Sequence, residues 1–205
     1  PVISHWGTSV IMDGRFDDDK SYVFTRGMTT AISITNGVNN ALMSFRICPT
    51  ASAGVGSSTL GSRELINRMQ MVLRQLDVFT NGQFLITLVL NGMPSTTQQW
   101  VNVGGSSLAQ YCRYASATTI TGGEVIFGFY TNPPGTVGST SYVTTQQELA
   151  LVRDMGTSIL SGGGLFSNQG IYPDGPDTVT IMARNLTAST SQNLSARLSW
   201  TEAQA

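Results

Sequence analysis

Two runs of β-branched and apolar residues stand out along the chain, at 84–91 (FLITLVLN) and 178–185 (TVTIMARN). Runs of this kind, bounded by polar turn residues, are typical of strands that lie in the interior of a sheet. Shorter runs of the same character predict further strands at 22–25, 41–47, 125–130 and 194–200. Asn36-Gly37 favours a turn and predicts a hairpin between 29–34 and 41–47.

Two segments have helical spacing instead. From Ser62 to Leu76, apolar residues recur at positions that share one face of a helix, namely Leu65, Ile66, Met69, Val72, Leu73 and Leu76. Residues 144–160 carry a second stripe, which consists of Leu149, Val152, Met155 and Ile159. This stripe follows a capping-box sequence, in which Thr145 would accept an amide hydrogen bond and Glu148 would reach back. The spacing therefore predicts two amphipathic helices.

The same order of segments occurs twice, which indicates an internal duplication. We expect residues 1–205 to form one domain, with N-terminal strands in 1–27, a first copy in 28–106 and a second copy in 107–205. The predicted fold is β-rich α+β, with two pseudo-equivalent halves that each hold several strands and one amphipathic helix. The alternative is a jelly-roll-like β-sandwich with the helices in crossover loops.

The chain is poor in charge. Charged residues make up 11% of the sequence, whereas roughly 25% is typical. Virion proteins, adhesins and secreted β proteins have this composition more often than intracellular enzymes do. The formal net charge of −1 does not favour nucleic-acid binding, and no run of 18 apolar residues predicts a membrane span. The chain begins Pro-Val-Ile-Ser, and we expect it to be a fragment or a processed product.

The usual catalytic constellations are missing from the sequence. His5 is the single histidine, and it lies near the start of the chain, where a rigid Ser-His-Asp triad is not expected. We therefore predict a protein that is not an enzyme and that binds no cofactor or metal. Asp13 and Asp17–Asp19 have calcium-type ligands, but a solvated turn explains them better. Cys48 and Cys112 are expected to be buried free thiols, although a bridge between them stays open.

Four stretches carry a resemblance: 5–14 (HWGTSVIMDG), 16–22 (FDDDKSY), 172–177 (YPDGPD) and 196–205 (ARLSWTEAQA). They resemble the C-terminal regions of large virion structural proteins of tailed phages that infect cyanobacteria. The resemblance covers the whole chain, and its motifs carry no known chemistry. It implies a virion location and a structural role in a surface or appendage domain. It also implies assembly with other virion proteins and with copies of the chain, for which a homotrimer is favoured.

A second hypothesis is a domain that binds host-surface carbohydrate. Tyr172, Asp174 and Asp177 are the candidate glycan contacts, because sugar rings stack on aromatic side chains and carboxylates bind their hydroxyl groups. The neighbouring Pro173 and Pro176 indicate that a rigid turn explains the same residues. A third hypothesis, a polysaccharide depolymerase, would need two acids that face each other across a groove.

Overall fold

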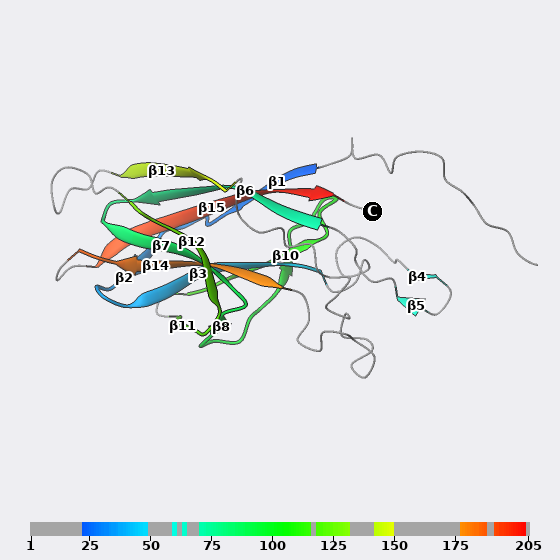
Figure 1. The fold of residues 1–205 in the computed structure, drawn as a ribbon, viewed down its shortest axis with the longest axis horizontal. Helices are drawn as coiled ribbons and strands as arrows, with labels where there is room; N and C mark the ends of the chain where they lie inside the picture. Colours follow the sequence, from blue (N-terminus) through cyan, green and yellow to red (C-terminus); the bar gives the residue numbers. More distant parts are fainter. Residues whose placement is uncertain are drawn as a thin grey trace, which may run out of the picture.

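The computed structural model describes residues 22–48, 59–60, 63–64, 70–115, 118–131, 142–149, 177–187 and 191–203. All regular secondary structure in these residues is β-strand, and the strands are arranged in two layers (Figure 1). The expectation of an α+β fold with one amphipathic helix in each half is therefore wrong. The described part of the chain is an all-β protein.

Two antiparallel sheets make up the layers. Sheet A has the strand order β1 (Tyr22–Gly27), β15 (Gln192–Ala203), β6 (Gln70–Thr80) and β13 (Val143–Glu148), and β2 (Ile32–Ile34) also pairs with β15. Sheet B has the order β12 (Glu124–Tyr130), β7 (Phe84–Leu90), β14 (Thr178–Asn185), β3 (Asn39–Ile47), β10 (Ala109–Arg113) and β9 (Val101–Asn102). Two short pairs lie outside these sheets, β8 (Met93–Pro94) with β11 (Ile120–Thr121), and β4 (Thr59–Leu60) with β5 (Arg63–Glu64).

The strand order is that of a jelly roll. Taken along the chain, the main strands are β1, β3, β6, β7, β12, β13, β14 and β15. Sheet A then contains the first, eighth, third and sixth of them, and sheet B contains the fifth, fourth, seventh and second. This alternation between two sheets is the double Greek key of jelly-roll proteins. The alternative expectation has the same strand arrangement, but its crossover helices do not occur in the residues described.

The core lies between the two sheets. Trp200 of β15 is fully buried, and its ring lies 5.5 Å from that of Phe45 on β3, measured between centroids. Phe24 of β1 stacks on Trp200 within sheet A at 6.1 Å. Aromatic pairs at these separations add to the stabilisation that their buried area provides. Trp200 therefore links the neighbouring strand of its own sheet to the opposite sheet.

A β-bulge explains why the first predicted helix is wrong. In the pairing of β6 with β15, Leu73 lies opposite Trp200 and Gln75 lies opposite Ser199, so Arg74 is an extra residue. The buried apolar side chains in this strand are Met71, Leu73, Leu76 and Val78. The bulge changes the spacing of buried positions from two to three at this point, and a spacing of three imitates a helix. Residues 62 and 65–69 of the predicted helix lie outside the described residues.

The second predicted helix is contradicted where the structure describes it. Thr145 lies in β13 opposite Val78 and does not cap a helix. The Leu149 amide donates to the Arg74 carbonyl oxygen at 2.7 Å, which continues the sheet pairing. A capping-box sequence is a local signal that would satisfy backbone N–H groups at the start of a helix. In this structure, pairing with β6 satisfies the backbone groups of the same residues instead. Residues 150–160 lie outside the described part.

The two strongest predicted strands, β7 and β14, are confirmed and lie side by side in sheet B. The predicted hairpin is wrong, because β2 pairs with β15 whereas β3 pairs with β10 and β14. Gly37 has a φ of 76° and takes the chain from one sheet to the other. Strands from 28–106 and 107–205 alternate within both sheets. The copies are therefore not separate sheet units, and the duplication itself stays a prediction.

We predict that Trp200→Ala lowers the free energy of unfolding by about 3–5 kcal/mol, because it leaves a large cavity between the sheets. Equilibrium unfolding in urea, followed by circular dichroism, measures this change. Val125→Ala is the matched control, because Val125 is 60% exposed. It should change stability by no more than about 0.5 kcal/mol. Equal effects of the two substitutions would contradict the central role of Trp200.

Candidate functional site

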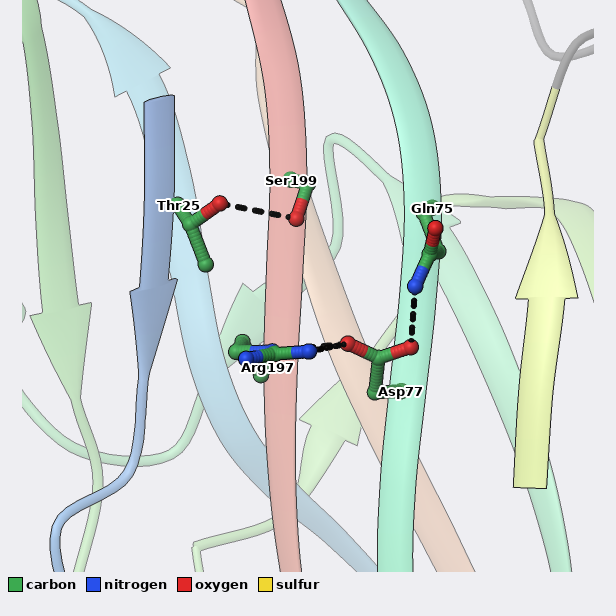
Figure 2. A network of polar contacts seen from close by, with 5 residues as sticks. All are labelled: Thr25, Gln75, Asp77, Arg197 and Ser199. Atoms are coloured by element: carbon green, nitrogen blue, oxygen red, sulfur yellow. Dashed lines mark hydrogen bonds and ion pairs between the residues drawn. The ribbon is translucent and has the colours of Figure 1, made fainter. Parts of the chain in front are cut away.

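The outer face of sheet A carries a polar network that joins three strands (Figure 2). Arg197 of β15 donates from Nε and Nη2 to Oδ2 of Asp77 on β6, at 2.7 and 2.6 Å. Gln75 donates to the other carboxylate oxygen of Asp77 at 2.6 Å. The Asp77 side chain is only 8% exposed, whereas that of Arg197 is 55% exposed. The guanidinium group therefore shields the carboxylate and neutralises its charge.

Small and hydroxyl residues of β1 complete this face. Thr25 hydrogen bonds to Ser199 at 2.9 Å between hydroxyl oxygens (Figure 2). Gly27 lies opposite Arg197, and a Cβ at this glycine would lie 3.1 Å from the Arg197 Cβ. The missing side chain gives the Arg197 stem room to lie beside β1. Cross-strand pairs of this kind stabilise a sheet face.

An exposed aromatic pair lies at the β13 edge of sheet A. Phe79 and Tyr142 stack with their centroids 4.7 Å apart and an interplanar angle of 6°. Phe79 is 45% exposed and Tyr142 is 40% exposed. Asn193 donates to the Tyr142 hydroxyl at 3.4 Å. The two rings therefore present exposed apolar surface beside the Asn193 amide group.

Glu202 is a fully buried acid that belongs to the core. Its carboxylate accepts hydrogen bonds from the Ser107 hydroxyl at 2.5 Å, the Leu108 amide at 3.0 Å and the Trp200 indole at 2.8 Å. A buried carboxylate needs such donors to offset the loss of water. The hydrogen bonds from Ser107 and Leu108 hold the segment before β10 against the end of β15. Its role is structural, because the group is inaccessible to a substrate.

Cys48 and Cys112 are both buried free thiols, as the sequence predicted. Burial raises the pKa of the Cys48 thiol to about 11, and the charge of Glu202 adds to this effect. Arg46 acts in the opposite direction and lowers the pKa. A thiol with a raised pKa is a poor nucleophile, because the thiolate is the reactive form.

The outer face of sheet B is covered by part of the segment between β7 and β12. Tyr114 from this segment hydrogen bonds to Ser44 of β3 at 2.7 Å, and Ser44 bonds to Thr180 of β14 at 2.6 Å. Burial raises the pKa of the Tyr114 hydroxyl. The Arg46 guanidinium lies 4.2 Å from the centre of the Trp100 ring, a cation–π contact. These contacts were missed from the sequence, where Trp100 in a polar stretch was the available signal.

Asp177 is the one predicted glycan contact that the structure describes. Its Oδ1 accepts a hydrogen bond from the Asn91 side chain at 2.8 Å, and Asn91 also accepts one from the Thr178 amide at 2.9 Å. These bonds hold the end of β7 beside the start of β14. Tyr172 and Asp174 lie outside the described residues, as do His5 and the acidic stretch 13–19. Whether the three candidate contacts lie together therefore stays a prediction.

Within the ranges that the structure describes, no group of three or more His, Cys, Asp or Glu residues could hold a metal ion. No helix in the same residues is long and apolar enough to cross a membrane. Comparison with protein-family models, curated proteins and solved structures finds no match to the chain.

We predict that alkaline conditions destabilise the protein through Cys48. Its thiol is neutral when folded up to about pH 11, whereas the ordinary pKa is 9.0. The neutral Cys48 thiol therefore makes its full contribution to the free energy of unfolding below pH 9. As the pH rises to 11, the free energy of unfolding falls by about 2–3 kcal/mol. Urea unfolding across this pH range measures the loss, which should be smaller by this amount in Cys48→Ala. Tyr114 is present in both proteins, so its raised pKa cancels. Parallel pH profiles would contradict the prediction.

Proposed function

We propose that the chain is a non-enzymatic structural protein of a virus particle. It acts as a surface or appendage domain that assembles with copies of itself and with other virion proteins. The observation that carries this proposal is the jelly-roll strand order. Viral capsid and lectin domains and cupins use this architecture, so the fold narrows the function without defining it. The resemblance to virion structural proteins of tailed phages favours the viral member of this group.

The surface supports the same proposal. Exposed large apolar side chains include Phe79, Met93, Val101, Val125, Tyr130 and Tyr142. The sequence contains Lys20 as its single lysine, and charged residues are scarce. Interfaces between proteins are enriched in aromatic residues and depleted in Lys, Glu and Asp. A surface with this composition is suited to being covered by neighbouring subunits.

Four shielded polar or reactive groups in the described residues support a structural role. Glu202 and Cys48 are fully buried, and Tyr114 is nearly so. Asp77 is shielded by Arg197. Catalytic acids, bases and nucleophiles need contact with a substrate. These groups instead fasten strands and loops to one another.

We predict that the purified chain self-associates at micromolar concentration, because its apolar surface is stabilised when subunits cover it. Light scattering coupled to size-exclusion chromatography measures the mass, and negative-stain electron microscopy detects larger particles. The same molar mass shows whether the assembly is the homotrimer expected from the phage resemblance. A protein that stays monomeric over the accessible concentration range would overturn the proposal of self-assembly.

A host-surface carbohydrate-binding domain is the second candidate, and the Phe79–Tyr142 stack favours it. We expect that, if this function holds, Phe79→Ala abolishes binding on a glycan array, because a sugar ring would lose its apolar platform. Val125→Ala, on another exposed strand, is the matched control and should bind normally. Tyr172→Ala tests the contact predicted from the sequence. Silence of the unmodified chain on a broad array would contradict carbohydrate binding.

A further inference from the structure

Strand β13 forms one edge of sheet A. The N–H and C=O groups of its successive residues point alternately towards β6 and away from it. The Leu149 amide bonds to the Arg74 carbonyl oxygen on β6. Because antiparallel pairing alternates along a strand, Val143, Thr145 and Gln147 also bond to β6. The N–H and C=O groups of Thr144, Gln146 and Glu148 therefore point away from β6. Among the described strands, none pairs with this side of β13.

The other sheet edges carry features that oppose pairing with another chain. Strand β12 has a bulge at Ile126 and a glycine at 128, and β9 is only two residues long. The β1 edge is divided, because β1 and β2 pair with different parts of β15. Strand β13 has six residues, no proline, no lysine or arginine, and no bulge in its pairing with β6. Natural proteins normally protect an edge of this kind.

We propose that β13 pairs antiparallel with β13 of a second copy, about a two-fold axis that passes through Gln146. Sheet A would then continue across two subunits. The inference rests on the proposed self-assembly and names the surface through which it occurs. The groups that point outward must face each other, so Gln146 lies opposite its counterpart and Thr144 lies opposite Glu148. This register pairs the whole strand, and the contact is isologous.

Charge and exposure favour a second copy of the same strand. Glu148 is the only charged residue of β13, and in this register the two Glu148 residues are offset by four positions. That offset is about 14 Å, which exceeds the Debye length of about 8–10 Å at moderate ionic strength. Each Glu148 instead faces a Thr144 hydroxyl, which can donate a hydrogen bond to it. The exposed rings of Phe79 and Tyr142 lie at the same edge, where the partner strand would cover part of them.

Proline at position 146 tests the proposed β13–β13 contact without removing a hydrogen bond between β13 and β6. The Gln146 N–H points away from β6, so Gln146→Pro removes only a donor of the free edge. Val23→Pro is the matched control. The Met28 amide donates to the Ala196 carbonyl oxygen, and alternate residues of β1 bond to β15 in the same register. The Val23 N–H therefore also points away from its neighbouring strand, β15. Sedimentation of the full chain and of both variants measures the dissociation constant, and unfolding midpoints compare their stability.

We expect the unmodified chain and Val23→Pro to form dimers or even-numbered assemblies. Gln146→Pro should raise the dissociation constant by roughly tenfold or more, because one donor is lost from each subunit. An assembly that Gln146→Pro leaves unchanged overturns the β13 contact and leaves self-assembly standing. A closed trimer also overturns it, because a two-fold contact cannot build one. A strictly monomeric chain overturns both the contact and the proposed self-assembly.

A cysteine at position 146 gives a result that does not depend on how proline affects folding. Residues opposite each other in a hydrogen-bonded antiparallel pair have Cα atoms about 5.5 Å apart, which a disulfide can span. Gln146→Cys should therefore form a covalent dimer under mild oxidation, seen on a non-reducing gel. The native Cys48 and Cys112 are buried and should not compete. Val23→Cys should stay uncrosslinked, and equal crosslinking of the two variants would overturn the register.

Discussion

The contact between Trp200 and Phe45 is the interaction on which the two-layer structure depends. Each sheet taken alone would expose one apolar face, and two stacked sheets bury both faces at once. Trp200 extends this contact to β1 through Phe24 and to Glu202 through its indole N–H. The same residue therefore combines the apolar packing of the core with the polar anchoring of the segment before β10.

Buried polar groups hold the segments that the sheets alone would leave loose. Glu202 fastens the segment that leads into β10, and Asn185 donates to the Ile34 carbonyl oxygen beside the connection from β2 to β3. Ser44 and Tyr114 hold the covering segment to the outer face of sheet B. Each of these side chains joins residues far apart in the sequence. They restrict the connections to one arrangement because an unpaired buried polar group is costly.

The low charge of the chain gives its outer surface a distinct character. On sheet A, the charges of Asp77 and Arg197 compensate each other, and their neighbours are hydroxyl and amide side chains. A face of this kind has little electrostatic repulsion towards a second copy. It also has little electrostatic specificity, so the choice of partner depends on backbone pairing and on aromatic contacts at the edge. Self-assembly through a sheet edge is consistent with both features.

The sequence by itself determined the parts of the fold that depend on local pattern. The apolar runs of β7 and β14 predicted interior strands correctly, because strands with two buried faces leave a continuous apolar signal. The buried free thiols of Cys48 and Cys112 were also predicted correctly, because two cysteines are too few for a disulfide framework and free cysteine is among the most buried residue types. For the candidate site, the sequence indicated Asp177, but its contact with Asn91 depends on β7 and β14 being neighbours.

Tertiary structure decided the rest. The bulge at Arg74 shifted the buried positions of β6 by one residue, so a strand carried the spacing of a helix. In β13, the residues that match a capping box became an edge strand because β6 offered backbone partners along its whole length. The Asp77–Arg197 pair and the Phe79–Tyr142 stack join residues 120 and 63 positions apart, respectively. Local sequence patterns carry no information about such pairs, because strand order alone brings them together.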